Sequence, residues 1–278
     1  MQSDFLEYLL SFNLSPESLL TYFFYSLLRL APICAITPFL GSKVVPIIGR
    51  MGFAIALSLI FMPIAIMTAK EPLIFNDMFL IYSLKEVLIG FVLAFLASMP
   101  FYAAEASGIL IDYSRGSSSL MGQNVLTQNQ ASSTGIFYNY ILIYMFYQFG
   151  GIELFFNAIV SSYEFMPVNK TLPITFYTIE NDFWKLVVST VGRIFALAIR
   201  FASPVLVAIL MAEVFLGIAN RLAPQVQISF LGIALKSLMG LLLLWTGWSF
   251  ILKNMVSETF DFIKLIDHTI KLLNLEFP

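Results

Sequence analysis

The chain has 278 residues, of which 59% are hydrophobic and only 12% are charged, and its formal net charge is −2. A soluble domain carries about a quarter charged residues, so much of this chain must face lipid or other apolar protein. No basic surface favours nucleic acid, and a single cysteine and a single histidine exclude an internal disulfide and the usual kind of zinc site. The acidic start, residues 1–7, lacks the basic region of a signal peptide, so we expect it to be retained.

Six apolar segments follow in chain order, each long enough or nearly long enough to cross a bilayer. They are Leu19–Leu40, Met51–Ala69, Met78–Ile111, Ile136–Val160, Phe183–Ile218 and Ile228–Leu252. The third and the fifth are too long for one simple span, and each has a proline near its middle, Pro100 and Pro204. Because proline removes a backbone donor and clashes with the preceding turn, we expect a kink or a break there. Each of the two is one long kinked helix or a hairpin of two helices, which predicts an all-α membrane protein of about six to eight helices.

The C-terminal segment has a different pattern. Apolar residues recur at spacings of three and four from Val256 to Phe277, and charged residues fill the gaps between them. This pattern predicts an amphipathic helix, which could lie on the membrane, bind a partner or pack on its own protein. We therefore divide the chain into a single helical membrane domain, residues 1–252, and an amphipathic C-terminal helix, residues 253–278.

Ionisable residues are unusually frequent inside the apolar segments. Each charge at the centre of a membrane helix costs roughly 2.5–3.5 kcal/mol on insertion scales. Such residues must pair with one another, face a polar cavity, or lie away from lipid. The set comprises Arg29, Lys85, Glu86, Glu105, Arg193, Arg200, Glu213 and Lys236.

One helical face in the third segment carries several of these features. Glu105, Gly108, Asp112 and Arg115 share that face at 100° per residue. Asp112 and Arg115 are three residues apart and are predicted to pair. Small residues beside them allow another helix to approach closely, so we expect a protein contact here and not a lipid contact.

A second face, in the fifth segment, carries two like charges. Arg193 and Arg200 are seven residues apart and also share a face. They require carboxylates or carbonyls from another element. Glu213 and Glu153 are candidates within the chain, and another subunit is equally possible.

Motifs for catalysis are missing from the sequence. There is no HExxH, no GxSxG and no Walker A pattern, and no histidine lies in the apolar region. We therefore expect a protein that is not an enzyme, with no catalytic, cofactor-binding or metal-binding residues and no cofactor.

Several motifs in a fixed order resemble one family. Residues 213–225, from Glu213 through Asn220, Arg221 and Pro224 to Gln225, resemble the signature of the T subunit of the type III export apparatus, the FliR/SpaR/YscT/HrcT family. Asp112-Tyr-Ser-Arg115-Gly116 looks like the Asp-x-x-Arg-Gly element of its injectisome branch, and Lys85-Glu86 and Lys236 stand at matching places. The likeness covers about residues 31–244, with Val226-Gln227 where the family usually has Leu-Asn.

The resemblance implies a function and a set of partners. The chain would be a subunit of a helical export gate, forming with R and S subunits the pore for unfolded secretion substrates, and would contact the U subunit, inner-rod or needle proteins and membrane lipid. It would lie in the bacterial inner membrane as a multi-pass protein that projects partly to the periplasmic side, and serve virulence in a needle-type system. Residues expected at subunit contacts or in structural roles are Glu86, Glu105, Gly108, Asp112, Arg115, Gly116, Glu213, Asn220, Arg221, Pro224, Gln225 and Lys236.

A polar loop after Arg115 resembles the plug of the closed pore. Gly122 gives it mobility, its amides offer exchangeable hydrogen bonds, and Met121 is soft, while the alternative is an ordinary solvated loop. Deleting residues 117–123 is then expected to make the assembled gate leaky to small ions. The plug residues are Ser117, Leu120, Met121, Gly122, Gln123 and Asn124.

Two other functions also fit the pattern of broken helices and embedded charges. A secondary small-molecule transporter would show them as well, together with an inverted repeat and a ligand pocket, but no repeat is visible in the sequence. A passive membrane scaffold differs from a gate only in whether the pore passes through it.

Overall fold

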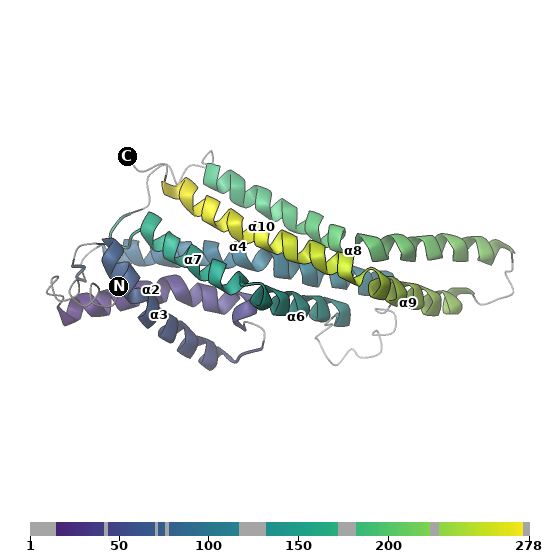
Figure 1. Cartoon of the computed structure of the whole chain (residues 1–278), viewed down its shortest axis with the longest axis horizontal. Coiled ribbons are helices and arrows are strands. Elements are labelled where there is room, and N and C mark those ends of the chain that lie inside the picture. The colour runs from purple at the N-terminus through teal and green to yellow at the C-terminus, as the bar shows by residue number, and fades with distance from the viewer. Residues whose placement is uncertain are drawn as a thin grey trace. The chain divides into compact units, whose positions relative to one another are not determined.

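The computed structural model describes residues 15–41, 44–69, 72–75, 78–116, 132–171, 182–222 and 228–274. These residues form helices and no strands, which confirms the all-α class (Figure 1). The helices are α2 Pro16–Ile36, α3 Ile47–Ala69, α4 Phe79–Ser114, α6 Ser133–Gln148, α7 Gly151–Phe165, α8 Asp182–Leu222, α9 Ile228–Thr246 and α10 Trp248–Asn274, with a short 3₁₀ turn, η1 Pro38–Leu40.

The helices meet the length and composition of membrane spans. Four of them, α2, α3, α4 and α8, are long and apolar enough to cross a bilayer alone. Two further pairs, α6 with α7 and α9 with α10, qualify as bent spans, with bends of 75° and 67°. The described part of the chain therefore holds four to six candidate spans.

The two long segments with central prolines are each one continuous helix. Helix α4 runs through Pro100 and α8 runs through Pro204, so neither is the hairpin that the sequence left open. In α8 the reason is visible at the proline, which deprives the carbonyl of Arg200 of its amide donor. The hydroxyl of Ser203 donates to that carbonyl at 2.9 Å, and so compensates for the missing hydrogen bond.

The breaks lie instead at glycines in the fourth and sixth apolar segments. Between α6 and α7, Gly150 adopts a left-handed conformation with φ of 75°, which a residue with a Cβ atom rarely takes. Between α9 and α10, the amide of Gly247 donates to the carbonyl of Leu243 at 2.8 Å, and its own carbonyl accepts from Ile251 at 3.0 Å. The hydrogen bonds thus continue through the second bend.

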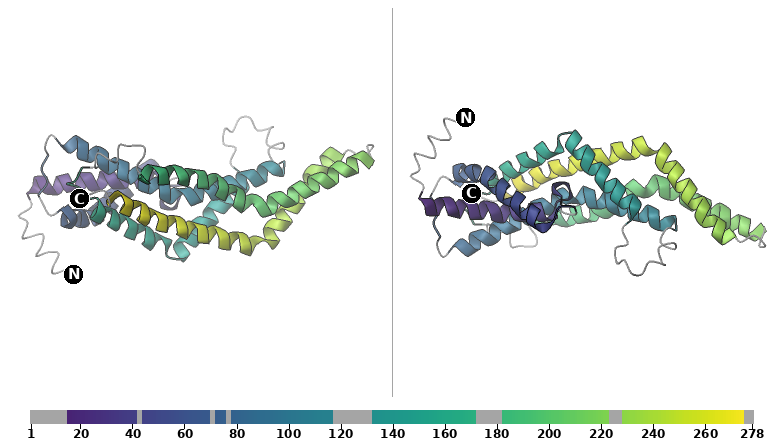
Figure 2. Two further views of the ribbon diagram at one scale, coloured as in Figure 1. Left: turned by 90° about the horizontal axis from the view of Figure 1, so that it is seen from above. Right: turned by 90° about the horizontal axis from the view of Figure 1, so that it is seen from below.

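The chain divides into two compact units, which are described separately. The first comprises Met1–Ser98, Gly151–Val188 and Phe262–Pro278, and the second comprises Met99–Gly150 and Ser189–Asp261. Figure 2 shows the helices of each from two further sides.

The first unit is built on α2, which begins at a capped end and packs against α3 and α4. The hydroxyl of Ser15 accepts a hydrogen bond from the amide of Ser18 at 3.2 Å, and Pro16 occupies the first helical position. These are the residue types that favour a helix start. Rings from distant segments fill the core, including Phe39 against Phe155 with centroids 5.0 Å apart.

The second unit holds the end of α4 against α6. Phe101 of α4 lies edge-on to Phe146 of α6 with centroids 5.5 Å apart. Phe137 of α6 stacks on Trp248 at the start of α10, with centroids 5.4 Å apart.

The predicted amphipathic tail is the C-terminal part of α10. This helix begins at Trp248 and has one buried face, which includes Ile251, Met255, Thr259 and Phe262. Of the three positions considered for the tail, the structure shows packing on the protein itself along this face.

Candidate functional site

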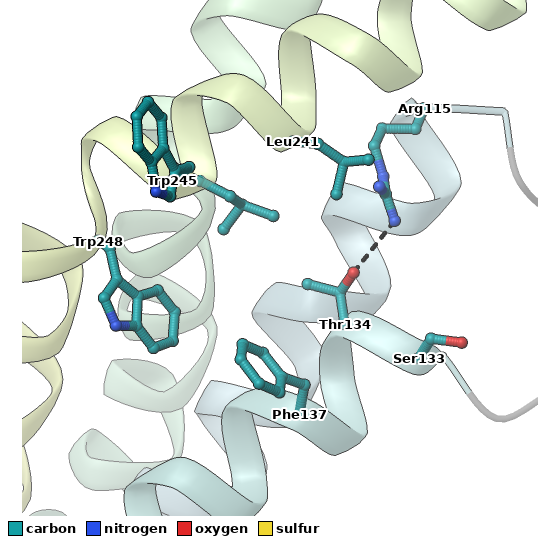
Figure 3. A pocket seen from close by; sticks show the side chains of 8 residues that line it. Arg115, Ser133, Thr134, Phe137, Leu241, Trp245 and Trp248 are labelled. Atoms are coloured by element: carbon teal, nitrogen blue, oxygen red, sulfur yellow. Dashed lines mark hydrogen bonds between the residues drawn. The ribbon is translucent and has the colours of Figure 1, made fainter.

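The first candidate site lies in the second unit around the carboxylate of Asp112. This carboxylate pairs with the guanidinium of Arg115, as the helical spacing predicted. It also accepts hydrogen bonds from the hydroxyl of Ser132 at 2.6 Å and from the amide and hydroxyl of Thr134 at 3.0 and 2.6 Å. Arg115 in turn donates to the hydroxyl of Thr134 at 3.1 Å (Figure 3). Asp112 therefore ties the end of α4 to the start of α6.

The helices α4 and α6 approach closely just beside this carboxylate. A Cβ atom on Gly108 would overlap the backbone of Gly135, and one on Gly135 would lie 2.8 Å from the carbonyl oxygen of Glu105. One turn along α6, the amide of Asn139 donates to the carboxylate of Glu105 at 3.1 Å. The face that the sequence marked for a protein contact thus contacts another helix of the same chain.

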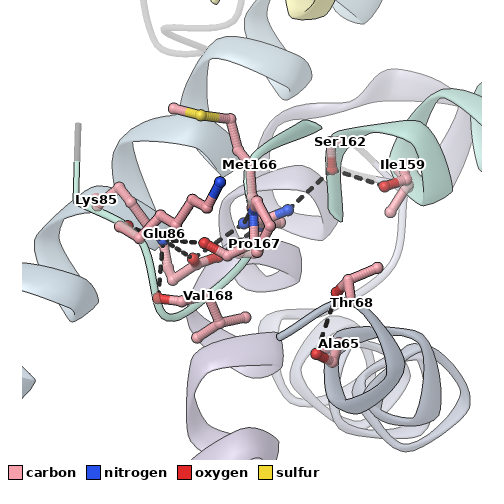
Figure 4. Close-up of polar contacts among 11 residues, drawn as sticks. Ala65, Thr68, Lys85, Glu86, Ile159, Ser162, Met166, Pro167 and Val168 are labelled. Atoms are coloured by element: carbon pink, nitrogen blue, oxygen red, sulfur yellow. Dashed lines mark hydrogen bonds and ion pairs between the residues drawn. The ribbon is translucent and has the colours of Figure 1, made fainter. Parts of the chain in front are cut away.

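The second candidate site is a buried charge cluster in the first unit (Figure 4). Arg29 of α2 and Glu86 of α4 form an ion pair in which both side chains are 0% exposed. The Nη2 atom of Arg29 lies 2.9 Å from Oε1 of Glu86 and 2.8 Å from the carbonyl oxygen of Met166. Its Nη1 atom donates to the hydroxyl of Ser162 at 3.1 Å, and the guanidinium lies 4.0 Å from the ring centroid of Tyr163. Every face of this guanidinium is therefore occupied by protein.

Lys85 completes the cluster from the neighbouring position on α4. Its ammonium donates to the carbonyl oxygens of Pro167, Val168 and Lys170 at 2.8, 3.0 and 2.9 Å. It also lies 2.9 Å from Oε1 of Glu86. One carboxylate thus pairs with two cations, and backbone carbonyl oxygens accept further hydrogen bonds from both of them. The cluster fastens the segment that follows α7 onto α2 and α4.

A glycine one turn beyond Glu86 allows these helices to meet. A Cβ atom on Gly90 would overlap the backbone carbonyl of Arg29. Small residues let helix backbones approach closely, and this approach brings Arg29 and Glu86 within reach of each other.

Two further ion pairs lie in the second unit and are partly exposed. Lys236 of α9 pairs with Glu213 of α8, and Arg200 of α8 pairs with Glu258 of α10. Glu213 and Glu153 were the intrachain candidates for pairing with Arg200, and for Arg200 that prediction is wrong. The actual partner lies in the amphipathic tail, whose contacts the sequence left undetermined.

The remaining predicted residues are placed as follows. Asn220 and Arg221 lie in the last turn of α8 and are exposed, and Gly116 follows α4 with φ of 79°. Asn220 also lines a small cavity with Glu213 and Lys236. The plug residues Ser117, Leu120, Met121, Gly122, Gln123 and Asn124, together with Pro224 and Gln225, lie outside the described residues. Their roles stay predictions.

The buried charge clusters join helices of the same unit to one another. Among residues that the structure describes, no group of three His, Cys, Asp or Glu side chains could hold a metal ion. Sequence reasoning missed Ser132, Thr134, Ser162 and the carbonyls of residues 166–170, because hydroxyls and backbone groups carry no pattern that marks them as ion partners.

Apolar helices of spanning length, with several embedded charges paired within the protein, define a membrane protein of the all-α class. The chain belongs to the family described as bacterial export proteins, family 1, whose model matches residues 20–262. This membership confirms the family resemblance found in the sequence.

Named relatives agree with the family. The chain is 29% identical over 177 residues to the secretion system apparatus protein SsaT of Salmonella typhimurium strain LT2, a match that covers 64% of this chain and 66% of that protein. It is 29% identical to the Yop proteins translocation protein T of Yersinia pestis, over 70% of this chain and 73% of that protein. It is 25% identical to the flagellar biosynthetic protein FliR of Bacillus subtilis, over 90% and 93% respectively.

Proposed function

We propose that this chain is a subunit of a type III secretion export gate. In this proposal it forms, with R and S subunits, the pore through which unfolded proteins cross the bacterial inner membrane. It contacts the U subunit and inner-rod or needle proteins, projects partly to the periplasmic side, and catalyses no chemical step itself. The family membership supports the export role, and the surface of α8 and α9 supports the assembly.

The Glu213–Lys236 pair is the observation that best supports assembly of this chain with other subunits. Its side chains are 45% and 23% exposed, yet many other exposed side chains of the same two helices are large and apolar. Lipid would leave a partly exposed ion pair poorly solvated, whereas polar groups of another protein or a water-filled lumen would not. The exposed apolar residues nearby on α8 and α9 are Val207, Leu210, Met211, Val214, Phe215, Ile218, Leu238, Leu241 and Leu242.

The first experiment is native mass spectrometry of this chain, co-expressed with its genomic neighbours and extracted in mild detergent. The expected result is one defined complex that contains several copies of two other small membrane proteins. A stable monomer or dimer would contradict the gate and favour a transporter. In an assembled complex, deletion of residues 117–123 then tests the plug, because an unchanged ion leak would exclude that role.

Site-specific crosslinking locates the contact surface. Cys34 is the one cysteine of the sequence, so a Cys34→Ala background carries no thiol. Phe215 is 68% exposed and its neighbour Leu216 is 9% exposed. Phe215→Cys is expected to crosslink to another gate subunit, and Leu216→Cys is the matched control that is not. Equal crosslinking from both positions would mean that α8 is not held at a defined interface.

A further inference from the structure

A cavity of about 520 Å³ lies in the second unit, among α4, α6 and the junction of α9 with α10. This size is within the range of small-molecule sites. Figure 3 shows the rings of Phe137, Trp245 and Trp248 and the side chain of Leu241 around it. Trp245 is 81% exposed, so the cavity opens to the surroundings on that side. Its walls are therefore apolar and largely aromatic, and they belong to an accessible site.

Polar groups gather at one end of this cavity. Arg115, Ser133 and Thr134 line that end. The side chain of Arg115 is 11% exposed, and both of its described hydrogen bonds, to Asp112 and to Thr134, leave from Nη2. Its Nε atom is buried and has no acceptor among the residues that the structure describes. A molecule in the cavity cannot reach that atom, but Arg115 lines this end and brings further N–H donors and a positive charge to it. This end of the cavity therefore favours an occupant that brings acceptors.

We propose that the cavity binds an anionic phospholipid from the surrounding bilayer. The guanidinium of Arg115 and the hydroxyl of Ser133 bind the phosphate, and an acyl chain lies between Phe137 and the two tryptophans. Guanidinium groups bind phosphate oxygens through charge-assisted hydrogen bonds, and tryptophan is enriched where headgroups meet acyl chains. An apolar side chain from a protein partner would contact the walls but would bring no acceptor to the Arg115 end of the cavity.

Tryptophan fluorescence tests which molecule enters the cavity. The chain has three tryptophans, and Trp184→Phe leaves only the two that line the cavity. This variant, purified as a full chain without its export partners so that no other tryptophan contributes, is placed in bilayers of phosphatidylcholine that contain brominated phosphatidylglycerol or, at equal fraction, brominated phosphatidylcholine. We expect quenching with an apparent affinity roughly tenfold higher for the anionic lipid, the gain of about one charge-assisted hydrogen bond. If this variant does not accumulate, the same ratio is measured on the unmodified chain.

Two leucine substitutions test the location. Leu244 lines the cavity, whereas Leu242 lies on the same helix and is exposed outside it. Native mass spectrometry is expected to show that Leu244→Trp loses bound phosphatidylglycerol and that Leu242→Trp keeps it. Equal quenching by the two lipids, or equal retention by the two variants, would reduce the site to ordinary lipid contact and overturn the proposal. An absence of quenching would also overturn it, in favour of a protein segment in the cavity.

Discussion

The guanidinium of Arg29 and the carboxylate of Glu86 form an ion pair between α2 and α4 that is closed off from the surroundings. Taking two charges out of water costs several kcal/mol per ion, so such a pair persists only if every remaining donor is satisfied. Ser162, Met166 and Lys85 complete the shell. The pair therefore specifies one arrangement of α2, α4 and the segment after α7. Mutation of either residue should destabilise that arrangement.

Glu86→Gln is expected to lower the free energy of unfolding by about 3–5 kcal/mol, since it leaves two buried cations without their anion. Thermal and denaturant unfolding of the complex in mild detergent measures this. Glu258→Gln is the matched control, because its partner Arg200 is 60% exposed and such a pair contributes only about 0–1 kcal/mol. Equal losses in both variants would show that the cluster contributes no more than a surface pair.

Gly90→Ala is expected to destabilise the first unit by about 1–3 kcal/mol, because the added methyl group overlaps the Arg29 carbonyl and must push α2 from α4. Gly52→Ala in α3 makes the same chemical change where no described atom lies within 4 Å. There the higher helix propensity of alanine should raise stability by about 0.5–1 kcal/mol. Unfolding measurements on both variants test the opposite signs, and a loss of the same size in both would contradict the close approach.

The sequence predicted features that depend on local spacing. Asp112 and Arg115 pair because positions three apart on a helix are neighbours, which holds before any tertiary contact forms. The partners of Arg29 are 57 and 133 residues away in the chain, and Arg200 meets Glu258 from the tail. Only the fold brings such residues together, so spacing rules cannot identify them.

The sequence predicted a kink or a break at Pro100 and Pro204, and it did not identify the two glycines where the helices bend. Proline acts on the local hydrogen-bond ladder, but its cost can be offset by a neighbour, as Ser203 does for Pro204. Gly150 and Gly247 merely permit a bend, and the surrounding packing decides whether the bend occurs. The presence of a glycine in an apolar segment therefore does not by itself predict that the helix bends there.

Reversing the Glu213–Lys236 pair tests whether these residues serve each other or another subunit. Glu213→Lys places two ammonium groups side by side on α8 and α9 and should reduce complex assembly and secretion. The exchanged pair, Glu213→Lys with Lys236→Glu, should recover most of the loss, with a coupling energy of about 0.5–3 kcal/mol. Glu153→Lys controls for the change in net charge at an exposed position of α7. If the double variant does not restore assembly, one of the two residues must contact a partner subunit that requires its original charge.

Asp112→Asn is expected to loosen the start of α6 without unfolding the chain. The carboxylate accepts from the amide of Thr134, and it also binds the hydroxyl of Ser132, which caps the amide of Gly135 at 2.9 Å. An amide group has one acceptor oxygen in place of two, so it cannot satisfy all of these donors.

Hydrogen exchange on the purified complex measures this loosening. We expect exchange at the amides of Thr134 and Gly135 to be roughly ten- to hundredfold faster, the effect of losing a hydrogen bond to a charged group. Asp261→Asn, at an exposed position of α10, should leave both amides unchanged. If exchange in Asp112→Asn also stays unchanged, the packing of Gly108 against Gly135 holds α6 in place without the carboxylate, and the prediction is wrong.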